Sequence, residues 1–115
     1  FHPYHYQKEL LEYCNSKNII IEAYSPLVHA KRMDEPRLVT ISEELSKTPA
    51  QVLIRWAMQR GMVVLPKSVN QNRIIENFAV FDFEISDSLM KRLDDLDERF
   101  VTCWDPHNPP PYAPV

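Results

Sequence analysis

A polar loop and the helix start that follows it carry two cations at a spacing that suits an anion. Lys67 lies just after the apolar, β-prone stretch 62–65. Arg73 follows Asn70, the expected N-cap of the next helix, by three residues and precedes Asn77 by four. Side chains at these spacings share one helix face. Lys67 and Arg73 can therefore converge on one anionic group beside the free backbone N–H groups of the helix N-terminus.

Neutral hydrogen-bonding groups accompany this pair of cations. Ser68, Asn70 and Asn77 offer hydroxyl and amide groups that suit a ribose or a base. An α/β fold places a phosphate at such a junction of strand, loop and helix. The plainer alternative is a surface lysine and a helix-start arginine. It leaves Arg73 in conflict with the helix dipole, and a bound anion removes that conflict.

The elements that must position these groups alternate between apolar strands and amphipathic helices. Residues 19–23 and 62–65 are almost continuously apolar, which is typical of parallel strands covered on both faces. Thr48 and Gln51 predict a capping box at the start of one helix, and Gly61 predicts its end. Helices are expected over residues 7–16 and 36–45 and from Thr48, Asn70 and Ser86 onward.

Composition limits the classes of function. The chain has 115 residues, of which 44% are hydrophobic and 25% charged, as in one small globular domain. Its net charge of −3 argues against nucleic-acid binding, and no apolar run is long enough for a membrane span. Its cysteines and histidines lack metal-ligand spacing, so no metal site is expected. Two lone cysteines fit a reducing compartment and predict a cytoplasmic location.

The first residues predict a further strand. Phe1-His2-Pro3-Tyr4 is typical of the end of a strand and its exit loop, and we therefore expect the chain to be part of a longer protein. Three strands are too few to close a barrel. Strands that alternate with helices indicate an α/β fold, and these three fit the last part of an eight-stranded (β/α)8 barrel.

Four stretches make the chain similar to the aldo-keto reductases, namely residues 1–4, 22–27, 48–56 and 65–84. They follow the order of the family and span nearly the whole chain. The last stretch is the most specific, because of the spacing between its Pro-Lys-Ser and Arg-x-x-Glu-Asn motifs. The resemblance matches residues 1–115 to the C-terminal part of the family's barrel domain, from about the sixth strand onward.

This resemblance implies a fold, a cofactor and a reaction class. Aldo-keto reductases are oxidoreductases that fold as (β/α)8 barrels and bind NADP(H) at the carboxyl ends of the strands. They reduce small-molecule aldehydes and ketones to alcohols. Their catalytic Tyr, Asp, Lys and His lie on earlier strands, so no catalytic residue is expected in this chain. We therefore expect residues 1–115 to bind the cofactor, but to fold poorly and to lack reductase activity by themselves.

The resemblance also assigns the nicotinamide end of a cofactor site. Tyr24 matches the aromatic residue that stacks on the nicotinamide. The loop beside the pyrophosphate consists of Ser25, Pro26 and Leu27. Val28 stands where many members of the family have glycine, so the shape of this loop is expected to differ.

The adenosine end of the site is assigned in the same way. Lys67 and Arg73 match the cations on the adenosine 2′-phosphate, which a guanidinium binds bidentately and an ammonium as a point charge. The loop around this phosphate and the ribose consists of Ser68, Val69 and Asn70. Glu76 and Asn77 match the contacts to the adenine end.

A basic segment follows the first of these loops, and its role has two interpretations. His29, Lys31 and Arg32 either approach the pyrophosphate or form an exposed basic loop.

The proline-rich tail, residues 103–115, supports a rival function of another class. Pro109 to Tyr112 fits the Pro-Pro-x-Tyr form of a WW-domain ligand, which binds as polyproline II in an aromatic groove. The chain would then be a non-catalytic interaction module with a WW-domain partner.

Overall fold

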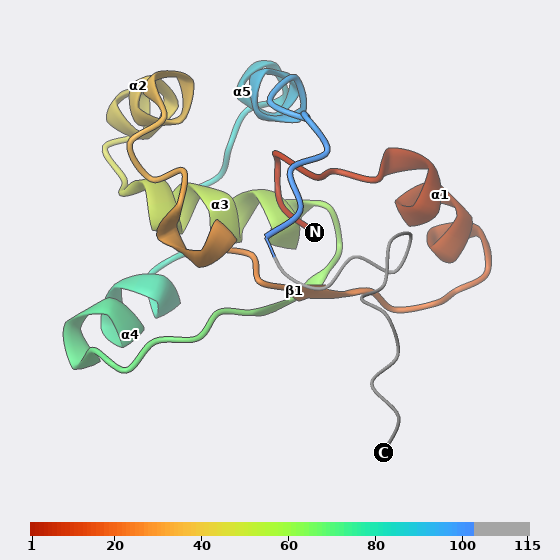
Figure 1. Cartoon of the computed structure of the whole chain (residues 1–115), viewed down its shortest axis with the longest axis horizontal. Helices are drawn as coiled ribbons and strands as arrows, with labels where there is room; N and C mark the ends of the chain where they lie inside the picture. The colour runs from red at the N-terminus through yellow and green to blue at the C-terminus, as the bar shows by residue number, and fades with distance from the viewer. Residues whose placement is uncertain (103–115) are drawn as a thin grey trace, which may run out of the picture.

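The computed structural model describes residues 1–102, which form five α-helices and a parallel sheet of two strands (Figure 1). The proline-rich tail, with the predicted WW-domain ligand, lies outside the described residues. None of the described helices is long and apolar enough to cross a membrane. In chain order, the elements are α1 (Lys8–Ser16), β1 (Glu22–Tyr24), the short 3-10 turn η1 (Val28–Ala30), α2 (Pro36–Glu44), α3 (Pro49–Gln59), β2 (Val63–Leu65), α4 (Gln71–Phe78) and α5 (Asp87–Asp94).

The two strands pair in parallel, with Ala23 opposite Val64 and Tyr24 opposite Leu65. Parallel pairing needs a crossover connection, and α2 and α3 supply it. Ala23 is fully buried, whereas Tyr24 and Leu65 are exposed on the other face of the sheet. β1 begins three residues later than predicted and ends one residue later, and β2 begins one residue later. The parallel pair and its helical crossover confirm the α/β class.

The first of the three expected strands is not formed. His2 and His5 make an isolated antiparallel bridge, in which the His5 N–H donates to the His2 carbonyl (2.8 Å). Pro3 lies in this turn and has no N–H for a strand ladder. The Tyr4 carbonyl accepts from the Phe100 N–H (2.8 Å), so the segment after α5, and not a sheet, holds the turn in place.

Helix α3 lies at the centre of the described residues and contacts α2, β2 and α4 (Figure 1). Its predicted capping box is confirmed. Thr48 Oγ1 accepts from the Gln51 N–H (3.3 Å), and Gln51 Oε1 accepts from the Thr48 N–H (3.0 Å). The helix ends before Gly61, whose φ of +79° is the left-handed conformation that glycine adopts without strain.

A hydrogen bond from a buried tryptophan connects α3 to α5. The Trp56 side chain is fully buried, and its Nε1–H donates to Asp94 Oδ1 (2.8 Å). Arg60 donates to the other oxygen of the same carboxylate. Asp94 therefore satisfies a buried donor and pairs with a half-buried cation at once.

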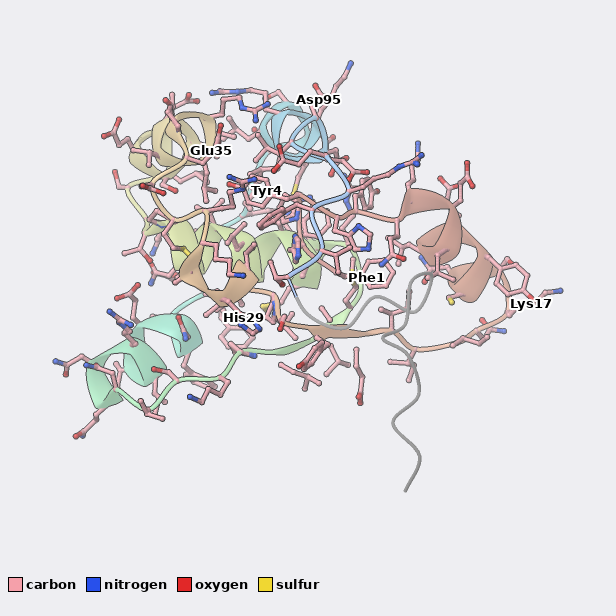
Figure 2. The ribbon with its side chains drawn as sticks, viewed as in Figure 1. Phe1, Tyr4, Lys17, His29, Glu35 and Asp95 are labelled. Carbon is pink, nitrogen blue, oxygen red and sulfur yellow. The ribbon has the colours of Figure 1, made fainter. Side chains whose placement is uncertain are left out.

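We expect Asp94→Ala to lower the free energy of unfolding by about 1–3 kcal/mol, because the buried indole N–H then loses its acceptor. Denaturant titration of the natural polypeptide that carries this sequence measures the change. Asp95→Ala is the matched control, since Asp95 is exposed at the end of α5 (Figure 2) and should change stability by less than about 0.5 kcal/mol. Equal effects of the two substitutions would contradict the role of Asp94.

The turn at the start of the chain buries an imidazole. The His2 side chain is only 4% exposed, and its Nδ1 has no hydrogen-bond partner among residues 1–102. Burial lowers the pKa of His2 from its ordinary 6.5 to about 3, with a smaller effect from His5. The folded state therefore holds this histidine neutral over a range in which the unfolded state protonates it.

This difference makes stability depend on pH with a definite sign. Above about pH 6.5 both states are neutral at His2, and below that the unfolded state binds the extra proton, so stability falls towards pH 3. Between pH 6.5 and pH 4, we expect the free energy of unfolding of His2→Leu to fall less steeply than that of the unsubstituted protein. Denaturant midpoints across this range measure both slopes, and identical slopes would refute the assignment.

Candidate functional site

Two neighbouring cavities lie where the loop after β1 meets the loop between β2 and α4. We call the first the cation cavity; it has a volume of about 450 Å³ and is lined by Leu27, His29, Ala30, Met33, Thr48, Pro49, Ala50, Lys67, Ser68, Arg73, Glu76 and Asn77. We call the second the tyrosine cavity; it has a volume of about 550 Å³ and is lined by Tyr24, Ser25, Pro26, Leu27, His29, Leu65 and Lys67. Leu27, His29 and Lys67 line both, so the two cavities adjoin.

The sequence-predicted residues gather at these cavities with two exceptions. Val69 and Asn70 line neither cavity. The Val69 side chain is 87% exposed. Asn70 is the N-cap of α4, as predicted, because its Oδ1 accepts from the Arg73 N–H (3.1 Å). Asn70 thus supports the helix that carries Arg73, whose side chain lines the cation cavity.

The two cations of the cation cavity have no ion-pair partner within residues 1–102. Lys67 and Arg73 are both exposed, and none of the ion pairs among the described residues includes either of them. Glu76 lines the same cavity, but its carboxylate accepts a hydrogen bond from the Thr48 hydroxyl (2.6 Å). Glu76 therefore brings a negative charge to the cavity, but neither Lys67 nor Arg73 is paired with it.

Asn77 adds a buried polar group to the wall. Its side chain is 9% exposed, yet no hydrogen bond among the described residues engages its amide. Because no hydrogen bond among residues 1–102 occupies it, this amide can both donate to and accept from a ligand. Asn77 also lines a mostly apolar groove beside the cation cavity, together with Ile74, Ile75 and Phe78.

The loop after β1 has an unusual backbone. Ser25, Val28, His29 and Ala30 all have φ between 50° and 60°, a left-handed conformation that costs energy for residues with a Cβ. Val28 is β-branched and fully buried, so the cost at this position is offset by apolar burial. Val28 thus adopts a conformation that glycine would adopt without strain, and the expected difference in loop shape from glycine-containing members stays a prediction.

The structure separates the three basic residues of this loop. His29 lines both cavities and lies within 3.0 Å of the Ser25 hydroxyl (Nε2 to Oγ), on the side of η1 that faces the loop after β2 (Figure 2). Lys31 lines neither cavity. Arg32 pairs with Glu98 (2.6 Å) and stacks over the Phe100 ring (4.2 Å to its centroid). His29 and Lys31 are exposed, and of the three residues only His29 lines the cavities, so an approach to the pyrophosphate stays a prediction for His29.

Sequence reasoning missed the α3 wall of the cation cavity. Thr48, Pro49 and Ala50 line it, whereas the sequence marks Thr48 only as a helix cap. Ala30 and Met33 were missed as well. No local spacing signals these contacts, because they join segments that are distant along the chain.

Comparisons with known proteins agree with this geometry. The sequence model of the aldo/keto reductase family matches residues 1–98. The chain is 45% identical over 105 residues to an uncharacterized oxidoreductase of Schizosaccharomyces pombe, covering 91% of this chain and 38% of that protein. It is 46% identical over 101 residues to the glyoxal reductase of Bacillus subtilis, covering 86% of this chain and 37% of that protein.

Solved structures share the fold. The crystal structure of a Gox0644 mutant in complex with NADPH is 38% identical, with a TM-score of 0.82 over 86% of this chain and 36% of that chain. MGS-M4, an aldo-keto reductase from a deep-sea metagenome library, is 33% identical, with a TM-score of 0.84 over 88% of this chain and 39% of that chain. The expected class, part of a (β/α)8 barrel, is thus confirmed. The chain spans less than two fifths of the length of these relatives, and it belongs to the aldo/keto reductase family of oxidoreductases.

Proposed function

We propose that this chain supplies the NADP(H)-binding portion of an aldo/keto reductase that reduces aldehydes and ketones to alcohols. In this proposal, residues 1–115 are the C-terminal part of the barrel domain. The observation that carries it is the pair of adjoining cavities, which share Lys67 and hold two cations without carboxylate partners. Their volumes are typical of small-molecule sites. The NADPH complex of the related Gox0644 mutant supports the same cofactor class.

The residues around the cation cavity fit the adenosine half of the cofactor. Lys67 and Arg73 would hold the 2′-phosphate through charge-assisted hydrogen bonds, beside the N-terminus of α4 and the Ser68 hydroxyl. Val69 and Asn70 shape the loop there, the latter through its cap on α4. We propose that Glu76 and Asn77 contact the adenine end, since a carboxylate accepts and an amide both donates and accepts.

The residues around the tyrosine cavity fit the nicotinamide half. Tyr24 ends β1 with its side chain 66% exposed, so its ring has an open face on which a nicotinamide would stack. The pyrophosphate would lie beside Ser25, Pro26 and Leu27. The cofactor, when bound, supplies the hydride. This chain binds and orients it, and we assign the proton donor for the substrate oxygen to residues on earlier strands of the family's barrel.

The 2′-phosphate assignment predicts a selective loss of affinity. In the natural polypeptide that carries this sequence, Lys67→Met or Arg73→Met should weaken NADPH binding by about 10- to 100-fold, the range of one charge-assisted contact. NADH lacks the phosphate, and its Kd should change less than about twofold. Fluorescence titration measures both Kd values, and Lys91→Met on the exposed side of α5 is the control. Equal losses for both cofactors would refute the assignment.

The position of His29 predicts a different pattern. A contact to the pyrophosphate is common to both cofactors, so His29→Ala should weaken NADPH and NADH binding by similar factors, about threefold to tenfold. Lys31→Ala, two residues away and outside both cavities, should leave both Kd values unchanged. An unchanged pair of Kd values in His29→Ala would contradict the contact.

A further inference from the structure

We propose that Thr48 is a positioning residue that holds the Glu76 carboxylate away from Arg73 and so sets the preference for NADP(H) over NAD(H). The proposal rests on the proposed function of the cation cavity. It concerns a helix cap that lies 28 residues from Glu76 along the chain and that sequence patterns connect only with α3.

The Thr48 hydroxyl has two partners, and together they fix the direction of its proton. Its Oγ1 accepts from the Gln51 N–H (3.3 Å) and lies 2.6 Å from Glu76 Oε1. A hydroxyl carries one proton, and an ionised carboxylate only accepts. The proton must therefore point at Glu76, which makes this a short charge-assisted hydrogen bond.

Gln51 holds the same part of α4 through its backbone. Gln51 Nε2 donates to the carbonyls of Glu76 (3.2 Å) and Ala79 (3.0 Å), while Gln51 Oε1 accepts from the Thr48 N–H (3.0 Å). Residues at the start of α3 thus form hydrogen bonds with both the backbone carbonyl and the side-chain carboxylate of Glu76. Because Gln51 fixes the main chain, loss of the Thr48 hydroxyl frees chiefly the carboxylate.

A freed carboxylate has a competing partner on its own helix. Arg73 and Glu76 are three residues apart on α4 and line the same cavity, and oppositely charged side chains at this spacing pair. In the structure Arg73 and Glu76 form no ion pair, and the Glu76 carboxylate accepts from Thr48. The Thr48 hydroxyl restrains the carboxylate, so the Arg73 guanidinium stays available to bind a phosphate.

The test compares the ratio of NADPH affinity to NADH affinity in the natural polypeptide that carries this sequence. Contacts to the adenine are common to both cofactors and cancel in this ratio. Thr48→Val, or Thr48→Ala if the valine variant does not fold, deletes the donor and should lower the ratio about threefold or more. Thr48→Ser keeps the donor and should leave it unchanged.

A second substitution separates this role from loss of the helix cap. Glu76→Gln removes the charge that would neutralise Arg73, so Thr48→Val combined with Glu76→Gln should return the ratio to that of Glu76→Gln alone. Ser86→Ala removes the N-cap of α5, away from the cavity, and should leave the ratio unchanged while lowering the melting temperature.

Two results would overturn the proposal: an unchanged ratio in Thr48→Val and Thr48→Ala, or a lowered ratio that Glu76→Gln does not restore. A failure of the proposed 2′-phosphate site would give a different result. If Arg73→Met leaves the ratio unchanged, the 2′-phosphate site itself is refuted and this inference with it. If Arg73→Met lowers the ratio and the Thr48 variants do not, only the role of Thr48 is refuted.

Discussion

Parallel pairing of β1 with β2 is the constraint on which the rest of the structure depends. Parallel neighbours end at the same edge of a sheet, so the segments that leave Tyr24 and Leu65 must begin side by side. Those two segments are the loop that carries His29 and the loop that carries Lys67. Because both loops leave from one edge, two cavities form there and share residues, as at the strand ends of other α/β proteins.

The same pairing gives α3 its second role. A helix that connects two parallel strands runs back against them, so its N-terminus lies at the edge where the strands end. The cap that starts α3 therefore stands beside the two loops, and Thr48 and Gln51 reach across to α4. At its other end α3 is fixed to α5 through Trp56 and Asp94. The helix that forms the crossover is also the support for the wall of the cation cavity.

The site combines strain with uncompensated charge, and both are typical of binding sites. Left-handed backbone at Val28 and His29 costs free energy. The Asn77 amide and the exposed cations Lys67 and Arg73 have no hydrogen-bond or ion-pair partner among the described residues. A dinucleotide phosphate would offer partners to the amide and to both cations. The open face of the sheet, where Tyr24 and Leu65 are exposed, adjoins the same cavities.

Local sequence determined the elements that depend on neighbours within about four residues. The capping box of Thr48 and Gln51, the N-cap at Asn70 and the grouping of Arg73 with Asn77 follow from spacing alone, and motif spacing also indicated the family. The caps were predictable because each of their hydrogen bonds joins residues within a single helical turn.

Tertiary structure decided which of the predicted groups meet. The hydrogen bond from Thr48 to Glu76 depends on how the crossover brings α3 to α4. The division between His29 at the cavities and Arg32 at Glu98 depends on the backbone of η1 and on the segment after α5. The turn at residues 2–5 is held by hydrogen bonds from the segment after α5 to the Tyr4 carbonyl, and these also join distant parts of the chain. Spacing along the chain specifies hydrogen bonds within a turn, whereas contacts between distant segments are specified only when the strands have paired.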